Sequence, residues 1–142
     1  MNKSKTKIFT KDEIMSRASL FALVDLKEEG RTAVMKVVNP FDWHVIRFDL
    51  DEYAKQSVKI KFSADVKRTG ASGTLCWQIN NNNYPALGRV SGANKDVWHK
   101  TSGEWSGFLE NTNPTIYLNT WRNDSERSTF YIDKVTIEVT LK

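Results

Sequence analysis

Hydrophobic and polar residues alternate along most of this chain. The stretch SVKIKFSADVK, residues 57–67, turns five apolar side chains to one side and lysines, a serine and an aspartate to the other. Successive side chains of a strand point to opposite faces, so this period of two predicts a β-strand buried on one face. TLCWQIN and WHVIRFDL alternate in the same way, and SLFALVDL and TAVMKVV are further predicted strands.

The last predicted strand, TFYIDKVTIEVTL, changes phase once. Phe130 and Ile132 share one face, and the apolar positions then resume at Val135 and Ile137. One extra residue in a strand shifts the alternation in this way. The sequence therefore predicts a β-bulge at Asp133–Lys134.

Turn-forming residues separate these strands, as in the asparagine run at 80–83 and the segment 111–114 that ends in proline. Only KDEIMSRA, residues 11–18, could form a helical turn or two, and it could equally begin a strand. Many short strands with this spacing predict an all-β fold, a β-sandwich or jelly roll of two antiparallel sheets. The length of 142 residues fits a single domain over 1–142.

Composition narrows the class of protein further. The chain has no apolar run of about 18 residues, so we expect no membrane span. No apolar stretch follows the basic opening MNKSKTK, so no signal peptide is predicted. Either the protein stays inside the cell, or it is a module of a larger secreted chain. The net charge of +4 is spread along solvated strand faces, which does not favour nucleic acid as a partner.

Few residues suggest catalysis. Cys76 is the only cysteine, so neither a disulfide nor a thiolate metal site can form within the chain, and packing is its expected role. The only histidines, His44 and His99, fit no triad or metal spacing. Glu104 and Glu110 lie near turns, and neither has an evident partner acid, although a glycoside hydrolase needs two facing carboxyl groups. The sequence therefore does not predict an enzyme.

Five tryptophans are more than a chain of this length usually carries. Trp77 shares a strand face with Leu75 and Ile79, so we expect it in the core. Trp98 and Trp105 flank HKTSGE, and packing is their expected role too.

The strand TIYLNTW is unusual because its second face is also aromatic. Ile116 and Leu118 fall on one side, whereas Tyr117, Asn119 and Trp121 fall on the other. The two rings are four residues apart, or roughly 13 Å along an extended strand. Two rings at this distance could contact more than one sugar ring of a chain. The alternative is that a loop or the second sheet buries this face.

Sugar chemistry suits this combination of side chains. An aromatic ring can cover the C–H face of a pyranose, and amides offer both donors and acceptors to its hydroxyl groups. Gln78 and Asn80 would supply amides from a neighbouring strand. The complete set of predicted ligand-binding residues is Trp43, Arg47, Gln78, Asn80, Tyr84, Tyr117, Asn119 and Trp121.

Three segments resemble a known family. FYIDKVTIEV, VWHKTSGEWS and VVNPFDWHVIRFDL are similar to segments of the jelly-roll carbohydrate-binding modules of the family 4, 9 and 22 group, and the likeness runs from about Thr32 to Leu141. In that group a W-x-x-x-S-G-x-W segment crosses the sandwich and a final F-Y-I-D-D-V strand closes it. By motif position, Trp43 and Tyr117 match binding aromatics of the group, whereas Trp121 comes from the strand phase alone.

The resemblance implies non-catalytic binding of a β-linked plant cell-wall polysaccharide, with xylan or mixed-linkage β-glucan favoured. It also implies an extracellular or cell-surface location and a partnership with a larger modular glycoside hydrolase. No cofactor is expected to be required, but such modules often hold a structural calcium, for which Asp133 would be one ligand. Lys134 departs from the family pattern, which has a second aspartate there. The alternative function is a structural or protein-docking sandwich that binds no glycan.

Overall fold

The computed structural model of the chain describes residues 5–18, 21–38, 44–70, 73–81, 86–121 and 129–142. These residues form ten strands, one short α-helix and two 3-10 turns. Their bounds are β1 Lys5–Ile8, α1 Lys11–Arg17, β2 Ala22–Leu26, η1 Lys27–Glu29, β3 Arg31–Val38, β4 His44–Asp49, η2 Asp51–Tyr53, β5 Ser57–Thr69, β6 Gly73–Ile79, β7 Ala86–Ala93, β8 Trp98–Phe108, β9 Thr115–Trp121 and β10 Thr129–Leu141.

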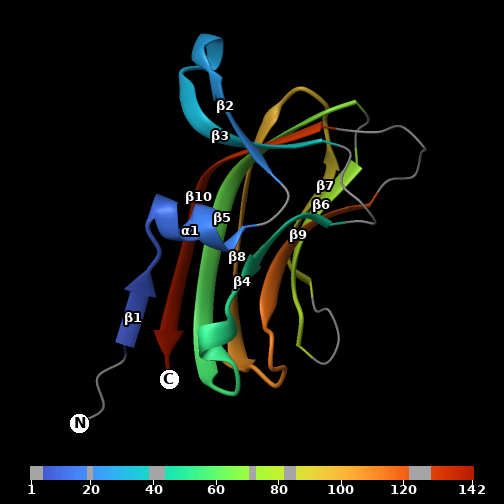
Figure 1. The fold of residues 1–142 in the computed structure, drawn as a ribbon. Helices are drawn as coiled ribbons and strands as arrows, with labels where there is room; N and C mark the ends of the chain where they lie inside the picture. The colour runs from blue at the N-terminus through green and yellow to red at the C-terminus, as the bar shows by residue number, and fades with distance from the viewer. Residues whose placement is uncertain (1–4, 19–20, 39–43, 71–72, 82–85, 122–128) are drawn as a thin grey trace.

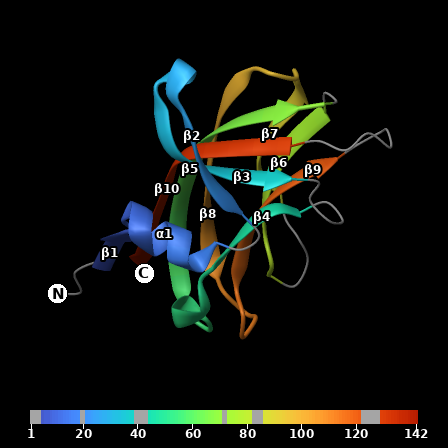
Figure 2. The ribbon, with the colours of Figure 1, turned by 45° about the horizontal axis from the view of Figure 1, so that its top comes forward.

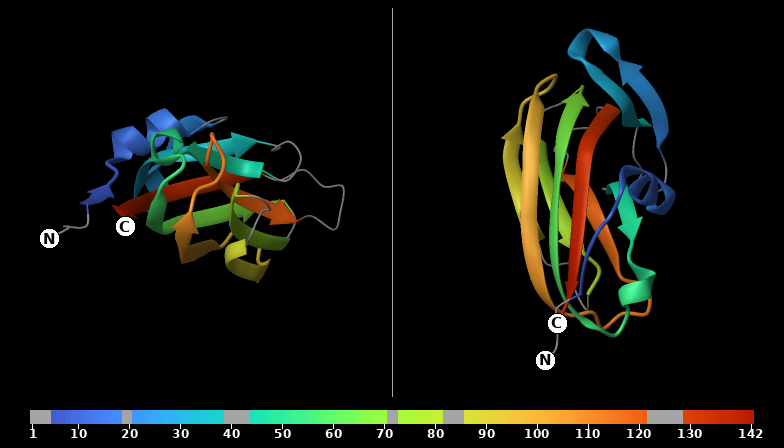
Figure 3. Two further views of the ribbon diagram at one scale, coloured as in Figure 1. Left: turned by 90° about the horizontal axis from the view of Figure 1, so that it is seen from below. Right: turned by 90° about the vertical axis from the view of Figure 1, so that its left-hand side faces the viewer.

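The strands form two antiparallel sheets that face each other (Figure 1). One sheet has six strands in the order β2-β3-β10-β5-β8, with β1 added beside β10, and the other has the order β4-β9-β6-β7. The long strands β10, β5 and β8 run side by side across the first sheet (Figure 3). The predicted all-β sandwich of two antiparallel sheets is confirmed.

Strand β10 lies in the middle of the six-stranded sheet and is paired on both sides. Its first residues pair with β3 and its last residues pair with β1, while β5 follows it along the other side. The register shifts between Asp133 and Thr136, and Lys134 adopts a φ of 51°. The bulge predicted from the change of phase is therefore present, because β10 must accommodate one residue more than its partner.

Helix α1 lies against β10, between β1 and the hairpin of β2 and β3 (Figure 2). The Thr10 side chain accepts a hydrogen bond from the Glu13 N–H, and Glu13 accepts one in return from the Thr10 N–H. This capping box satisfies two N–H groups at the helix start, and Ile14 buries the apolar side of the helix. Of the two structures that KDEIMSRA allowed, the helix forms.

The core fills the space between the two sheets. All five apolar residues of the β5 alternation, from Val58 to Val66, are at most 2% exposed. Trp77 extends from β6 to the opposite sheet, where its ring centre lies 4.9 Å from that of Phe62. Its indole N–H donates to the Thr101 hydroxyl over 2.8 Å. The prediction that Trp77 is a core residue is confirmed.

Two glycines allow β7 and β8, which belong to different sheets, to approach each other closely. A Cβ added to Gly88 would lie 2.5 Å from the carbonyl oxygen of Ser102, and one added to Gly103 would lie 2.6 Å from that of Leu87. Backbone atoms cannot yield as a flexible side chain can. The sandwich is therefore closed along this side by a contact that only glycine permits.

None of the helices in the described part of the chain has the length and apolar character that a membrane-spanning helix needs.

Candidate functional site

The outward face of the four-stranded sheet gathers four of the residues predicted to bind a ligand. Tyr117 of β9 is paired with Arg47 of β4 on one side and with Gln78 of β6 on the other. Asn119 lies two residues further along β9, opposite Cys76. Since alternate residues share a face and paired residues lie side by side, Arg47, Tyr117, Gln78 and Asn119 form one polar and aromatic patch.

The core confirms the strand phase from which this patch was predicted. Ile116 and Leu118 belong to the hydrophobic cluster between the sheets, whereas Tyr117 does not. Tyr117 is nevertheless only 8% exposed, and Asn119 only 3%. These two residues therefore form the largely buried floor of the patch, and the exposed Arg47 lies beside Tyr117.

An amide pair holds part of this floor together. The Asn119 Nδ2 group donates a hydrogen bond to Gln78 Oε1 across the two strands. Asn80 plays a different part, because its Oδ1 accepts from the Asn111 side chain over 2.6 Å. Asn80 therefore ties the end of β6 to the segment before β9, while Gln78 and Asn119 lie on the sheet itself.

Three of the predicted binding aromatics have side chains outside the described part of the chain. Trp43 and Tyr84 lie outside the described residues. Trp121 ends β9, and its backbone is paired with Thr74. Their role in binding stays a prediction from the sequence.

Arg89 of β7 is a further residue of this face that the sequence analysis missed. It is exposed, and it is paired with Cys76, which in turn is paired with Asn119. Exposed Arg47 lies on β4, at the opposite edge of the sheet. Strand β7 has the sequence ALGRVSGA, and its two glycines obscure the alternation that would have revealed Arg89.

Cys76 occupies the floor without offering a nucleophile. It is fully buried, and burial raises the pKa of its thiol, an effect that the neighbouring Arg89 only partly opposes. A thiol with a raised pKa stays protonated and unreactive near neutral pH. The expected packing role of Cys76 agrees with this environment.

Three acids, Asp49, Glu104 and Glu110, lie on or beside strands β4 and β8. Asp49 lies at the end of β4, opposite Thr115. Glu104 lies on β8 of the other sheet, where its carboxylate is 3.8 Å from the Lys59 ammonium group. Glu110 follows β8, and its backbone N–H donates to the Asn81 side chain. These positions do not provide the facing pair of carboxyl groups that glycoside hydrolysis needs.

The two remaining tryptophans pack elsewhere, as expected. Trp105 lies against the edge of the core. Trp98 lies on the outer side of the six-stranded sheet, and the guanidinium carbon of Arg31 is 3.8 Å from its ring centre. The arginine covers one face of the Trp98 ring, so that face is closed to a sugar.

Asp133, the predicted calcium ligand, also belongs to the six-stranded sheet. Its Oδ2 accepts a hydrogen bond from Arg31 and its Oδ1 accepts one from the Lys134 N–H. Both oxygens thus already bind donors, and no group of three or more His, Cys, Asp or Glu side chains with metal-binding geometry occurs among the described residues. This arrangement does not fit calcium, which needs about six to eight oxygen ligands.

Comparison with known proteins identifies the fold. No protein-family model and no curated protein matches the chain. Among solved structures, the CBM22-1 xylan-binding domain of Paenibacillus barcinonensis Xyn10C is similar, with a TM-score of 0.64 and 12% identity over 94% of this chain and 85% of that one. The C-terminal family 22 carbohydrate-binding module of Clostridium thermocellum Xyn10B has a TM-score of 0.61 and 13% identity, over 93% and 83% of the two chains.

A larger structure contains the same fold beside a catalytic module. It comprises the CBM22-1 and GH10 modules of Clostridium thermocellum xylanase 10B in complex with xylohexaose, with a TM-score of 0.60 and 18% identity. The match covers 93% of this chain but only 25% of that one. Together with the two antiparallel sheets, these similarities show that the chain has the jelly-roll fold of the family 22 carbohydrate-binding modules.

Proposed function

We propose that this protein is a non-catalytic carbohydrate-binding module that binds xylan across the outward face of its four-stranded sheet. The observation that carries the proposal is the patch of Tyr117, Asn119, Gln78 and Arg47, which lies on that face rather than in the core. The similarity in fold to modules described as xylan-binding supports the choice of ligand.

The patch offers the two kinds of contact that a sugar chain requires. The part of Tyr117 that remains exposed can contact apolar C–H groups of a sugar, and the amides and guanidinium can bind its hydroxyl groups. Because Asn119 and Gln78 are bonded to each other, their side chains are held in place before a ligand arrives. Binding then costs less conformational entropy than it would with mobile side chains.

The similarity to xylan-binding modules also suggests what kind of protein this module belongs to. A binding module that is joined to a catalytic domain in one polypeptide raises the effective concentration of that domain at the polysaccharide. The xylanase structure that joins a family 22 module of similar fold to a GH10 module supports a parent glycoside hydrolase for this protein. A location outside the cell is proposed from the family resemblance of the sequence. Mixed-linkage β-glucan is the second ligand to test, since its backbone is also a β-linked chain of pyranoses.

Electrophoresis through native gels that contain xylan, mixed-linkage β-glucan, mannan or xyloglucan tests this proposal. We expect xylan to retard the protein, and Tyr117→Ala to weaken the binding. Stacking of a flat ligand on an aromatic side chain is worth about 1–3 kcal/mol, so the loss should be about 5- to 150-fold in affinity.

The matched control is Tyr131→Ala, which removes a tyrosine from the outer side of the other sheet, where Lys67 lies over its ring. This variant should bind xylan as the unmodified protein does. Equal losses in the two variants would contradict the placement of the site. Unchanged migration of the unmodified protein in all four gels would instead favour the structural or protein-docking sandwich.

A further inference from the structure

Two carboxylates face each other on the outer side of the six-stranded sheet. Asp133 of β10 is directly paired with Asp65 of β5. Like charges that lie opposite each other on neighbouring strands destabilise a sheet. This pair therefore needs a cation, and the calcium that the family resemblance implies would be one candidate.

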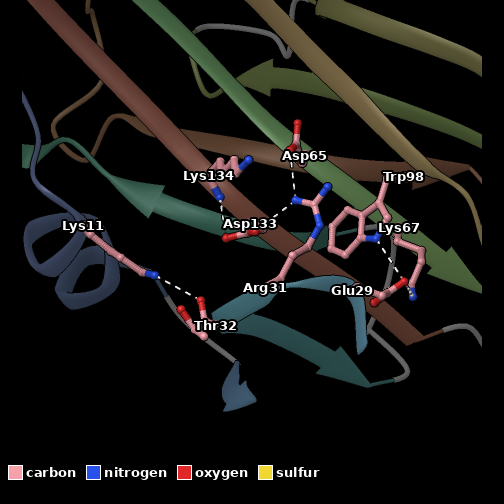
Figure 4. A network of polar contacts seen from close by, with 9 residues as sticks. All are labelled: Lys11, Glu29, Arg31, Thr32, Asp65, Lys67, Trp98, Asp133 and Lys134. Atoms are coloured by element: carbon pink, nitrogen blue, oxygen red, sulfur yellow. Dashed lines mark hydrogen bonds and ion pairs between the residues drawn. The ribbon is translucent and has the colours of Figure 1, made fainter. Parts of the chain in front are cut away.

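Arg31 already lies between the two acids (Figure 4). Its Nη1 atom is 3.0 Å from Asp65 Oδ2 and 3.0 Å from Asp133 Oδ2. The side chains of Arg31, Asp65 and Asp133 are 18%, 19% and 8% exposed, so water screens these contacts only weakly. One guanidinium group thus bridges the pair within a largely enclosed site.

The fold holds this guanidinium in place from several sides. Arg31 begins β3, directly after the tight turn at Gly30, and its guanidinium group lies on the ring of Trp98. Burial alone would lower the pKa of Arg31, but the hydrogen bonds to Asp65 and Asp133 outweigh it and raise the pKa. The Arg31 guanidinium therefore carries a positive charge at neutral pH.

The surroundings of Asp133 also disfavour a second cation. Lys11 and Lys134 line, together with Asp133, a cavity of about 230 Å³ between α1 and the bulge of β10. Lys134 stands where the family pattern has a further aspartate, so a negative charge is replaced by a positive one beside Asp133. Asp133 thus contacts Arg31 and shares a cavity with two lysines, whereas a calcium site gathers several oxygen ligands around the cation.

We propose that the guanidinium of Arg31 is the permanent cation of the Asp65–Asp133 pair and takes the structural place that the family resemblance gives to calcium. The domain then folds and stays folded without a divalent metal at Asp133. This inference concerns the six-stranded sheet and does not depend on glycan binding by the other sheet.

The first test is thermal unfolding of the unmodified protein after treatment with EDTA, measured with and without added calcium. About 10 mM calcium is sufficient, because calcium sites of extracellular modules have Kd values of about 10⁻⁴–10⁻³ M. We expect added calcium to change the Tm by less than about 2 °C, which is no more than a weak surface interaction would cause. A larger increase that Asp133→Asn abolishes would overturn the proposal, whereas one that persists in Asp133→Asn would place calcium elsewhere and support it.

The second test measures the coupling between Arg31 and Asp133. Arg31→Gln leaves the facing carboxylates without their bridge, so it should lower the Tm by more than about 4 °C. In the Asp133→Asn background the repulsion is already relieved, so the same substitution should cost less than half as much. An equal decrease in both backgrounds would refute the proposed role of Arg31, as would no decrease in either.

Lys67→Gln is the matched control for this second test. Lys67 forms an ion pair with Glu29 over 2.7 Å on the same side of the sheet, but it does not bridge the two aspartates. Its removal should lower the Tm by a similar amount with and without Asp133→Asn. If Arg31→Gln fails to fold, the calcium measurement on the unmodified protein still decides the question.

Discussion

A hydrogen bond between Trp77 and Thr101 connects the two sheets, and removing it tests how the sheets are held together. Trp77 comes from the four-stranded sheet and Thr101 from the six-stranded one. The Thr101 hydroxyl accepts from the indole N–H over 2.8 Å and donates to the Ala64 carbonyl over 3.2 Å. Trp77 is 1% exposed and Thr101 3%, so water cannot easily replace either contact.

Thr101→Val should therefore lower stability although it conserves shape and β-branching. The substitution leaves a buried N–H group and a buried carbonyl without the hydroxyl that pairs them, which costs about 1–3 kcal/mol. Unfolding entropy of about 2.1 cal/mol/K per residue gives about 0.3 kcal/mol/K for 142 residues. The Tm should consequently fall by about 3–10 °C.

Differential scanning calorimetry measures this decrease, and Thr136→Val controls for the exchange of threonine for valine in a strand. The Thr136 hydroxyl contacts Ser63 on the exposed side of β10, where substitutions usually change stability by no more than about 0.5 kcal/mol. Equal Tm values for the two variants would show that the contact between Trp77 and Thr101 does not stabilise the sandwich.

Three further predictions concern ligand binding, close packing and pH. Trp121→Ala should weaken xylan binding at least tenfold, or about 1.4 kcal/mol, with an unchanged Tm in calorimetry; a loss of folding would instead make Trp121 a core residue. Gly103→Ala should lower the free energy of unfolding in urea by about 1–3 kcal/mol, because the new Cβ would meet the Leu87 carbonyl, and an unchanged midpoint would show that β7 and β8 can separate at no cost. The Arg17 side chain lowers the pKa of Glu52 below the ordinary value of 4.5. The stability from this pair is therefore present above pH 4.5 and is lost as the pH falls through the lowered pKa. Arg17→Gln should make the Tm less sensitive to pH below 4.5, and parallel curves of Tm against pH for the two proteins would contradict this linkage.

The proposed ligand site and the Arg31 bridge lie on different sheets. The xylan-binding patch follows β9 and β6, whereas Arg31 bridges β10 and β5 and contacts Trp98 of β8. Substitutions at one surface should therefore leave the other property unchanged, because distant sites without shared partners contribute independently. This separation allows the function and the stabilising bridge to be tested in the same set of variants.

Much of the fold was predictable because strand phase is a local property. The alternation from Val58 to Val66 and the change of phase at Asp133–Lys134 are both visible in the chain, and the structure contains the strand and the bulge that they predict. The same rule separated Tyr117 from Ile116 and Leu118. Such predictions need only the geometry of one strand, in which successive side chains alternate.

What the sequence could not supply is the identity of neighbours across strands. Arg31 and Asp133 are 102 residues apart, and only the sheet order β3-β10-β5 brings Arg31 to Asp133 and Asp65. The amide contact between Asn119 and Gln78, which are 41 residues apart, likewise depends on the pairing of β9 with β6. The chain by itself therefore determined which face the side chains of β5, β9 and β10 occupy, whereas the pairing of distant strands decided which charges and amides meet there. Those contacts form only when the sheets assemble.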